Sequence, residues 1–436
     1  MRFVADLHVH SKYSRAVSQA MVLPEMQKWA GKKGIDLLSA ADFTHPIWFR
    51  EISSQLTEDG EGVYKLKDAN TPTRFVLSTE ISSIYTQGGK VRRIHNLIFV
   101  PNLETAHKFS AELLKRGCNL SSDGRPIVGL SSRNILDLLL TVNPNSFLIP
   151  CHAWTPWFSL YGSNSGFDSI DECFQDLSKE IFGIETGLSS DPEMNWRIPE
   201  LDNRSILSFS DAHSAVKIAR EVTVFDLESL NFPSLKKAVQ KMGENKVDST
   251  IEFYPEEGKY HYTGHRNCGV VQTPEETAQK GNVCPVCKRN LTVGVMHRVE
   301  QLAKRPTNTK ISTDEFSVSW VEDPTGLHPK YVKLVPLVEI LSECLSVMPG
   351  SLKVLAKFDE MVEKFNSEIE ILLKTKTSDI EKDFGERIAS GISRVRKQNI
   401  EVSPGFDGEF GKVKIWNPQN IETIQTAVPE EQLGLF

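Results

Sequence analysis

The chain lacks any long apolar run. No uninterrupted apolar stretch in its 436 residues approaches the roughly 20 residues that a membrane helix needs. The first residues enter a predicted strand at once, without the charged and then apolar leader of a secreted protein. We therefore expect a cytoplasmic protein without a membrane partner.

Cysteine is also scarce, and neither acidic nor basic residues are in large excess. Seven cysteines, an odd number in a chain of this length, do not make a disulfide framework and fit a reducing compartment. The formal net charge is only −7, although 25% of the residues are charged, so a local basic surface remains compatible with the total. Length and apolar content predict two or three soluble, globular domains.

Metal-ligand residues follow successive apolar runs. Residues 3–7 predict a buried strand that leads to His8 and His10, and alternate spacing puts both imidazoles on one side of the backbone. A lone pair of this kind is more often two ordinary histidines in a loop. Five later apolar runs also carry such residues, namely Asp42, His45, Glu80, His95, His152, Asp211 and His213. Independent core histidines have no reason to choose the same end of successive strands, so a shared metal site is favoured.

Strands and helices alternate through this part of the chain. Helices are predicted over 23–33, 132–140 and 169–180, between strands at 35–39, 74–77, 93–100, 147–150, 181–185, 205–209 and 221–225. Such alternation predicts parallel strands with ligands at their carboxyl ends. We interpret residues 1–250 as one α/β barrel domain.

These motifs resemble a known family. Asp6-Leu-His-Val-His10, Asp42-Phe-Thr-His-Pro46 and Ser210-Asp-Ala-His213, with the single ligands between them, are similar to the metal-binding motifs of the polymerase and histidinol phosphatase (PHP) family. The resemblance implies a distorted seven-stranded β/α barrel with a trinuclear site that hydrolyses phosphoesters. Many members carry a further His or Asp after the first pair, where this chain has Ser14-Arg-Ala16, and Asp42 is the available substitute.

The ligand types predict the chemistry. Imidazoles with carboxylates suit two to three divalent metals, chosen from Zn²⁺, Mn²⁺, Mg²⁺ and Fe²⁺, and Glu80 or Asp211 can bridge two ions about 3.5–4 Å apart. Such ions activate water for in-line attack on phosphorus, so the reaction needs no Ser or Cys nucleophile.

Two loops after predicted strands, residues 152–166 and 185–196, are rich in aromatic and small polar side chains. Aromatic rings can stack on a base while polar groups contact its edge. The candidate substrate-binding residues are Trp154, Trp157, Tyr161, Glu185, Ser190, Asn195 and Trp196. Loop packing explains any one of these aromatics more simply, but the set beside a metal site favours a nucleotide pocket.

A different pattern begins after residue 250. His265, Cys268, Cys284 and Cys287 form two short pairs with the spacing of a structural zinc ribbon or knuckle, and His261 is close enough to compete with His265. We predict a zinc-binding module over residues 251–300 with one structural Zn²⁺ that contributes to its folding energy. Residues 259–310 contain nine Lys or Arg against three Asp or Glu. A run of basic residues usually forms a solvated surface. Beside a phosphoesterase, however, this run favours contact with a nucleic-acid backbone.

Residues 301–416 are predicted to be mainly helical. Helices are expected at 334–345, 352–374 and 380–396, followed by a turn at 403–408 and a short strand at 412–416. Residues 417–436 read as a flexible tail. Its last pentapeptide, with Gln432, Leu433, Leu435 and Phe436, resembles the peptide with which bacterial proteins bind the DNA sliding clamp. The alternative is that these apolar side chains fold back onto the helical region.

Along nearly its whole length the chain resembles the endonuclease Q subgroup of the PHP family. The resemblance implies a DNA-repair endonuclease, nucleoid-associated in the cytoplasm, that cuts 5′ of deaminated bases (uracil, hypoxanthine and xanthine) and abasic sites with the base flipped out. Two alternatives are a PHP phosphatase for a small phosphomonoester and a non-catalytic PHP platform. The phosphatase would gain nothing from a basic zinc module, and the platform should have lost ligands that are present here.

Overall fold

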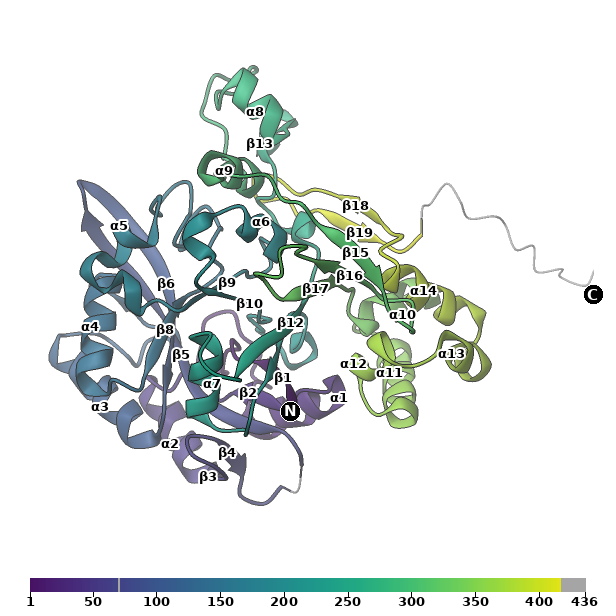
Figure 1. The fold of residues 1–436 in the computed structure, drawn as a ribbon, viewed down its shortest axis with the longest axis horizontal. Helices are drawn as coiled ribbons and strands as arrows, with labels where there is room; N and C mark the ends of the chain where they lie inside the picture. The colour runs from purple at the N-terminus through teal and green to yellow at the C-terminus, as the bar shows by residue number, and fades with distance from the viewer. Residues whose placement is uncertain (70, 417–436) are drawn as a thin grey trace, which may run out of the picture.

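The computed structural model describes residues 1–69 and 71–416 (Figure 1). A large mixed sheet runs through the molecule in the strand order β15-β16-β17-β12-β11-β1-β2-β5-β4-β3, and β6, β7 and β8 extend it from β5. Its first strands are β1 (Arg2–Asp6), β2 (Leu37–Ser39), β3 (Leu56–Glu58), β4 (Tyr64–Leu66), β5 (Arg74–Gln87), β6 (Lys90–Val100), β7 (Ile127–Val128), β8 (Phe147–Pro150), β11 (Val222–Asp226) and β12 (Lys246–Glu252). Strands β9 (Gly183–Glu185) and β10 (Ser205–Leu207) form a separate pair.

Amphipathic helices cover this sheet. They are α1 (Leu23–Lys33), α2 (Pro46–Gln55), α3 (Leu103–Lys115), α4 (Ser132–Val142), α5 (Ile170–Phe174), α6 (Pro192–Trp196) and α7 (Phe232–Val239). Helix α3 illustrates the local rule: Asn102 caps its first turn by accepting from the backbone N–H of Thr105, and Ala106, Phe109 and Leu113 form its buried face. Helices α3 and α4 lie together on the outer side of β6 and β8 in Figure 1.

The sheet is mixed, whereas the alternation of strands and helices predicted parallel strands. Strands β1, β2 and β5 are parallel neighbours, but β6 is antiparallel to β5 and to β8, and β11 is antiparallel to β1. Gly88 and Gly89 explain the first reversal: their φ angles of 61° and 73° allow the tight turn that joins two antiparallel strands. No ladder joins β8 to β9 or β10 to β11 in the described residues, so a closed seven-stranded barrel stays a prediction.

The sheet also continues into the region that was expected to be mainly helical. Strands β15 (Lys310–Thr313), β16 (Ser319–Glu322) and β17 (Lys330–Lys333) were not predicted, because four-residue strands carry too little alternation to stand out. Strand β17 pairs in parallel with β12, from Ser249 opposite Lys330 to Glu252 opposite Lys333. The division into residues 1–250, 251–300, 301–416 and 417–436 stays a prediction, and this pairing crosses two of its boundaries.

A small projecting unit and a helical region complete the described chain. The first contains β13 (Thr263–His265), β14 (Val270–Gln272), α8 (Pro274–Lys280) and α9 (Val295–Leu302). The second contains α10 (Leu337–Leu345), α11 (Leu352–Phe365), α12 (Glu368–Leu373), α13 (Thr377–Phe384), α14 (Glu386–Arg396), β18 (Glu401–Ser403) and β19 (Lys412–Lys414). The two longest predicted helices are each divided, at Asn366 and at Gly385, whose φ angles of 73° and 87° are incompatible with a continuing helix.

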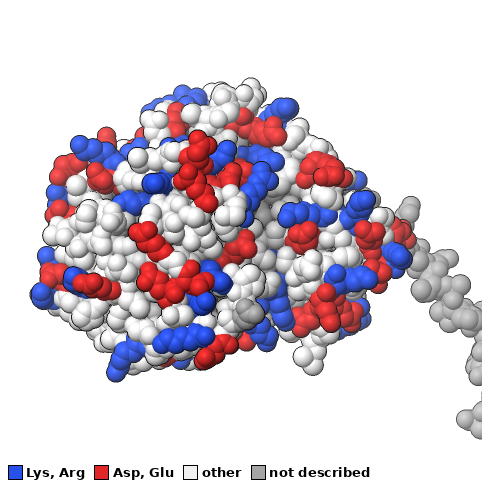
Figure 2. All heavy atoms as spheres, turned by 60° about the horizontal axis from the view of Figure 1, so that its bottom comes forward, with Lys and Arg blue, Asp and Glu red and all other residues white. Residues whose placement is uncertain are grey.

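Across the described part of the chain, no helix has the length and apolar content that crossing a membrane requires. Acidic and basic side chains are interspersed on the face shown in Figure 2, which agrees with the modest net charge. The predicted tail, including Gln432, Leu433, Leu435 and Phe436, lies outside the described residues.

Candidate metal centre

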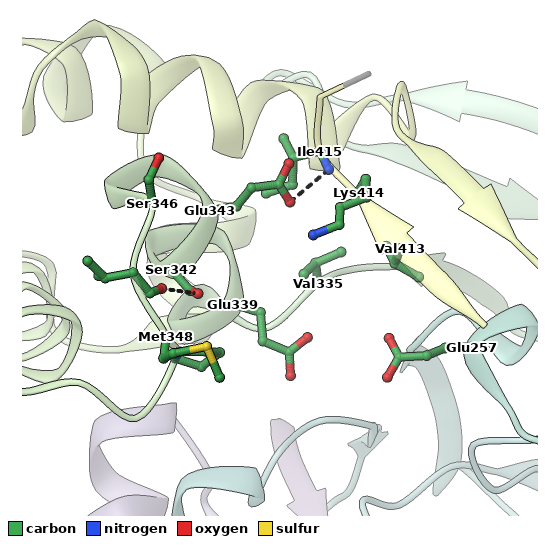
Figure 3. Close-up of a pocket in the computed structure, with 12 residues that line it drawn as sticks. Glu257, Val335, Glu339, Ser342, Glu343, Ser346, Met348, Val413, Lys414 and Ile415 are labelled. Carbon is green, nitrogen blue, oxygen red and sulfur yellow. Dashed lines mark hydrogen bonds between the residues drawn. The ribbon is translucent and has the colours of Figure 1, made fainter. Parts of the chain in front are cut away.

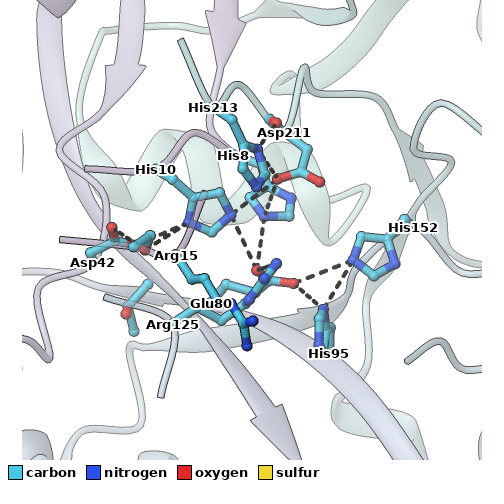
Figure 4. Close-up of polar contacts among 12 residues, drawn as sticks. His8, His10, Arg15, Asp42, Glu80, His95, Arg125, His152, Asp211 and His213 are labelled. Atoms are coloured by element: carbon cyan, nitrogen blue, oxygen red, sulfur yellow. Dashed lines mark hydrogen bonds and ion pairs between the residues drawn. The ribbon is translucent and has the colours of Figure 1, made fainter. Parts of the chain in front are cut away.

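Ligand atoms from several strands converge at one place (Figure 4). His8 and His10 follow β1, Glu80 lies on β5, His95 on β6, His152 follows β8 and Asp211 follows β10. They form two groups whose ligand atoms lie within 4.8 Å of one another: His8, His10 and Asp211, and Glu80, His95 and His152. Six of the nine predicted active-site ligands therefore meet.

Glu80 joins the two groups. Its Oε2 lies 3.2 Å from His10 Nε2, while its Oε1 lies 2.5 Å from His95 Nδ1 and 3.3 Å from His152 Nε2. Glu80 sits within its strand rather than after it, because β5 runs on into the antiparallel hairpin with β6, and His95 lies within β6 as predicted.

Three atoms of the first group are buried without a hydrogen-bond partner in the described residues: His8 Nε2, His10 Nε2 and Asp211 Oδ1. Unpaired polar atoms are costly in a protein interior. They also face one another, since Asp211 Oδ1 lies 3.0 Å from His10 Nε2 and 3.6 Å from His8 Nε2. An imidazole and carboxylate set of this kind fits a divalent cation.

The electrostatics of the second group depend on an arginine that sequence reasoning missed. Arg125 Nη1 lies 3.1 Å from Glu80 Oε2. Burial by itself would raise the pKa of Glu80, but His95 and Arg125 hold that pKa well below its usual range. Burial lowers the pKa of His95 to about 4, which keeps its imidazole available as a neutral ligand. Arg125 lies in the loop before β7, which has no recognisable motif, so no sequence signal marked it.

Glu185 lies behind the ligands, whereas it was predicted to contact substrate. Its two oxygens are 2.8 and 3.0 Å from His8 Nδ1, and its Oε2 accepts the backbone N–H of His152 at 2.8 Å. Because Glu185 is fully buried, it can orient His8 and hold the His152 backbone but cannot reach a substrate in this conformation.

Asp42, which was also predicted to be a ligand, lies outside the two ligand groups and contacts protein donors. Its Oδ2 accepts from Ser11 N, Ser11 Oγ and Ser14 Oγ at 2.7–2.8 Å, and its Oδ1 lies 3.1 Å from His10 Nδ1. The carboxylate is therefore saturated by protein donors. Ser14, which stands where many PHP proteins have a further ligand, is one of these donors.

His45 also lies outside the two ligand groups. It caps α2, where its Nδ1 accepts the backbone N–H of Trp48 at 3.4 Å, and its ring stacks on Tyr13 at 4.4 Å. His213 stands at the rim with a side chain that is 35% exposed, and its ring centre is 4.9 Å from that of His10. Of these two predicted ligands, only His213 borders the first group.

Cys151 is a further neighbour that sequence reasoning had treated as a scattered thiol, together with Cys118, Cys173 and Cys344. Its Sγ lies within 4.8 Å of ligand atoms of His8 and Glu80. Burial raises the pKa of the Cys151 thiol well above its usual range. It therefore stays protonated at neutral pH and lines the centre as a small apolar group.

The backbone is strained at two of the grouped ligand residues and at Asp42, which contacts His10. Asp42, His152 and Asp211 have φ angles of 40°, 27° and 46°, which non-glycine residues rarely adopt. Gly187 permits the second of these, because a Cβ on it would lie 2.4 Å from the Cβ of His152. Such strain is typical of functional sites that the surrounding structure holds in place.

Most of the predicted substrate-binding side chains pack inside the loops in this structure, so their contact with a base stays a prediction. Trp154, Tyr161, Ser190, Asn195 and Trp196 are all buried. Trp154 Nε1 donates to Asn195 Oδ1 at 2.7 Å, Tyr161 donates to Glu200, Ser190 donates to the carbonyl of Thr186, and Trp196 stacks on His328. Buried aromatics with polar tips tend to pair those tips internally, as Trp154 and Tyr161 do here. Only Trp157 is half-exposed, with its ring edge-on to Tyr260.

A cavity of about 270 Å³ opens beside the centre. His152 and Asp211 form part of its wall, and Lys259, Tyr260, His261 and Phe410 form another part. His261 Nδ1 is buried there without a hydrogen-bond partner in the described chain. Sequence reasoning placed Lys259 in the basic run but not at this centre, and it missed Tyr260 and Phe410, because no motif relates them to the strand ends.

The predicted zinc ligands also meet. Ligand atoms of His265, Cys268, Cys284 and Cys287 lie within 4.8 Å of one another, and His265 rather than His261 completes the set. The backbone N–H of Cys287 lowers the pKa of Cys284 to about 6, which favours the thiolate that zinc binds. Part of the basic run is used internally, since Arg298 pairs with Asp168 and Arg305 pairs with Asp202.

Comparisons with known proteins agree with this architecture. A family model for the MJ0043 C-terminal domain matches residues 336–399, which contain α10 to α14. Protein MJ0043 of Methanocaldococcus jannaschii is 32% identical over 284 residues, which are 64% of this chain and 33% of that protein, so the chain spans about a third of this relative. Protein YqxK of Bacillus subtilis is 28% identical over 431 residues, with coverage of 95% and 99%.

Two solved structures are similar over 98% of this chain and 100% of their own. One is the lesion-specific endonuclease PfuEndoQ from Pyrococcus furiosus, with a TM-score of 0.80 and 26% identity. The other is Endonuclease Q in complex with a 27-mer duplex that carries an abasic lesion at the active site, with a TM-score of 0.82 and 28% identity. The fold of this chain is therefore the one that these two DNA endonucleases share. The chain is a structural relative of endonuclease Q, which confirms the resemblance predicted from its motifs.

Proposed function

We propose that this chain is a DNA-repair endonuclease that hydrolyses the phosphodiester 5′ of deaminated bases and abasic sites. The observation that carries the proposal is the junction at Glu80 of two buried groups of imidazole and carboxylate ligands. The similarity to lesion-specific endonucleases supports the choice of DNA as substrate.

The residues of this chain prepare the reaction by fixing orientation and charge. When bound, divalent cations at such a site lower the pKa of water and neutralise charge on a phosphoryl oxygen. His8, His10 and Asp211 would hold one cation, and Glu80, His95 and His152 another. Glu185 and Asp42 fix the rings of His8 and His10 from behind, while Arg125 keeps Glu80 ionised.

The damaged base is proposed to leave the duplex and enter the cavity beside the centre. A stacked base cannot approach ligands that lie below the protein surface, so extrusion precedes inspection. The cavity adjoins His152 and Asp211, and its wall offers the ring of Tyr260 and the unpaired His261 Nδ1. This wall replaces the packed side chains of residues 154–196 as the proposed base contact.

The zinc-binding module is proposed to contact the phosphate backbone. Arg266, Lys288 and Arg289 are exposed and form no ion pair within residues 1–69 and 71–416, so they are available to phosphates. One structural Zn²⁺ would fix the loops that carry them.

A nicking assay tests the enzymatic proposal against its two alternatives. Duplexes with uracil, hypoxanthine, an abasic site or no lesion, and a chromogenic phosphomonoester, are incubated with Mn²⁺ or with chelator. We expect one cut 5′ of each lesion that needs the metal. Preferred hydrolysis of the monoester would favour the phosphatase, and no turnover of any substrate would favour the non-catalytic platform.

Asp211→Asn provides the internal check, because it removes a charged ligand and keeps the shape of the side chain. We expect a folded protein without nicking activity, whereas Asp168→Asn, on the exposed surface, should cut normally. Near-normal turnover by metal-saturated Asp211→Asn would remove this residue from the centre.

Binding to a bacterial sliding clamp is a separate proposal that rests on the pattern of Gln432, Leu433, Leu435 and Phe436 alone. A peptide of residues 425–436 should bind the clamp in calorimetry, and Leu435→Ala with Phe436→Ala in the full chain should weaken binding without changing the nicking of short duplexes. Unchanged affinity of that double variant would dismiss the proposal.

A further inference from the structure

A hairpin from the C-terminal region reaches the candidate metal centre. Strands β18 and β19 pair with each other and lie beside the segment that leads from β12 into the zinc-binding module (Figure 1). Three backbone N–H groups of the hairpin donate at 2.8–2.9 Å to carbonyls of that segment: Gly405 to Glu256, Gly408 to Lys259 and Gly411 to Glu257. The position of the hairpin is therefore set by backbone contacts.

Side chains fasten the hairpin at both ends. At its tip, Asp407 accepts from Arg266 N at 2.7 Å and from Thr292 Oγ1 at 2.5 Å, which ties it to the zinc-binding module. At its base, Glu343 of α10 accepts the backbone N–H groups of residues 415 and 416, each at 3.1 Å, beside a hollow of about 580 Å³ (Figure 3). These contacts fix the position of the hairpin and therefore of the side chains at its tip.

The tip carries Phe410, which is 66% exposed. This side chain lines the same cavity as His152 and Asp211 and belongs to none of the hydrophobic clusters of the described residues. Its ring lies 4.4 Å from Lys259 Nζ, and Lys259 forms no ion pair within those residues. An exposed phenyl ring gains none of the free energy that burial would provide. The position of the hairpin is set by its backbone and Asp407 contacts, so Phe410 is not needed to hold it.

Single exposed apolar residues are common and need no function. Phe410 differs because a rigid hairpin holds it at the edge of the cavity that adjoins two proposed ligands. The half-buried aromatic rings nearby are held by neighbours: Trp157 and Tyr260 pack edge-on against each other, and Phe158 packs against His95. Phe410 is therefore the ring that is best placed to enter a bound duplex.

We propose that Phe410 inserts into the DNA helix where the damaged nucleotide leaves it, and that Lys259 binds the adjacent phosphate. Extrusion of a nucleotide leaves neighbouring bases unstacked, and an apolar ring that fills the gap restores stacking. The ammonium group beside the ring supplies the charge that a phosphate needs. This proposal rests on the proposed function and deepens it, because it assigns the group that stabilises the opened duplex.

The test compares paired with unpaired substrates. Single-turnover cleavage is measured for uracil in a fully paired duplex and in a single strand, with wild-type protein, Phe410→Ala, Phe410→Trp and the control Leu352→Ala. Leu352 is 86% exposed on α11 and remote in sequence from the hairpin. We expect Phe410→Ala to lose about ten-fold or more on the duplex and only about two-fold on the single strand, because only the duplex needs its gap filled. Phe410→Trp should retain most of the duplex rate, and Leu352→Ala should match wild type.

A second measurement does not depend on cleavage. A duplex with 2-aminopurine next to uracil is bound in the presence of chelator, and unstacking of the probe is followed by fluorescence. We expect a rise with wild type that Phe410→Ala loses and Phe410→Trp keeps. Equal losses on both cleavage substrates, or an unchanged rise with Phe410→Ala, would overturn the insertion. Absence of cleavage by the wild type would instead reject the proposed function, while the fluorescence still decides on Phe410.

Discussion

His8 Nδ1 lies 2.8 Å from Glu185 Oε1, between two fully buried side chains that are 177 residues apart in sequence. The same carboxylate accepts the backbone N–H of His152. One residue of β9 therefore connects a proposed ligand after β1 with one after β8, and within residues 1–69 and 71–416 no strand ladder joins β9 to β8. This contact adds a second link between the two ligand groups besides Glu80.

Glu185→Gln should weaken metal binding. The amide keeps the shape of the side chain but removes the charge that orients His8, and loss of such a partner typically costs about 10–100-fold in metal affinity. Isothermal titration of the metal-free chain with Mn²⁺ measures the change. Glu221→Gln is the matched control, because burial raises the pKa of Glu221 well above its usual range and its carboxyl is already neutral. Equal effects of both variants would contradict the orienting role.

Cys284→Ser should remove one zinc ion per chain and lower the thermal midpoint of the protein. Cys284 is buried among four converging ligands, and loss of one ligand leaves the module without the metal that fixes its loops. Metal analysis of purified protein and a thermal scan measure the two effects. Cys118→Ser, at a half-buried thiol outside the module, should change neither. Full zinc content in Cys284→Ser would exclude this residue as a ligand.

The stability of the protein should fall as pH rises from about 5 to 8. Burial raises the pKa of Glu252 from its ordinary 4.5 to about 7. Between these values the folded protein keeps a proton that the unfolded chain has lost, so the free energy of unfolding decreases with pH, by on the order of 3 kcal/mol. Urea unfolding at several pH values measures the slope. Glu252→Gln should reduce the slope without abolishing it, because burial also raises the pKa of Glu221, whereas the exposed Glu104→Gln should leave it unchanged; an unchanged slope in Glu252→Gln would refute this origin.

Arg396→Ala should destabilise the helical region. This arginine is fully buried and donates to the carbonyls of Phe316, Ile371, Leu372 and Thr375. Its loss leaves several buried acceptors unpaired, which costs at least about 3 kcal/mol. Urea unfolding measures the loss, and the surface variant Arg116→Ala should stay within about 0.5 kcal/mol of wild type. A similar small effect of Arg396→Ala would mean that water replaces the guanidinium.

The parts of the fold that sequence predicted are those with strong local signals. Residues 23–33 and 147–150 form the predicted helix and strand at the predicted bounds, since one has an amphipathic pattern with Pro24 and Gly34 at its ends and the other is a continuous apolar run. The direction of β6 depends on a glycine turn whose effect on topology only the assembled sheet reveals. Strands β15 to β17 are ordered by their partner β12, not by their own sequence.

The candidate site also contains residues that the sequence predicted and residues that it could not predict. Metal-ligand residue types at strand ends predicted His8, His10, His152 and Asp211, because a strand end fixes where a side chain points. Sequence spacing cannot distinguish a ligand from a residue that orients a ligand, and Asp42 and Glu185 prove to contact histidine rings. Residues such as Arg125 and Phe410 approach the centre only through tertiary packing, so no local pattern could have indicated them.

Anomalous X-ray diffraction from crystals of the full chain grown with Mn²⁺ tests the central claim most directly. The claim is that two ligand groups joined by Glu80 form one metal centre. We predict two separate anomalous peaks, one contacted by His8, His10 and Asp211 and the other by Glu80, His95 and His152. In crystals of Asp211→Asn, at least the first of these peaks should be lost. Fully formed ligand groups without a peak at either position, in crystals that show the expected metal at His265 and its three cysteines, would contradict the account.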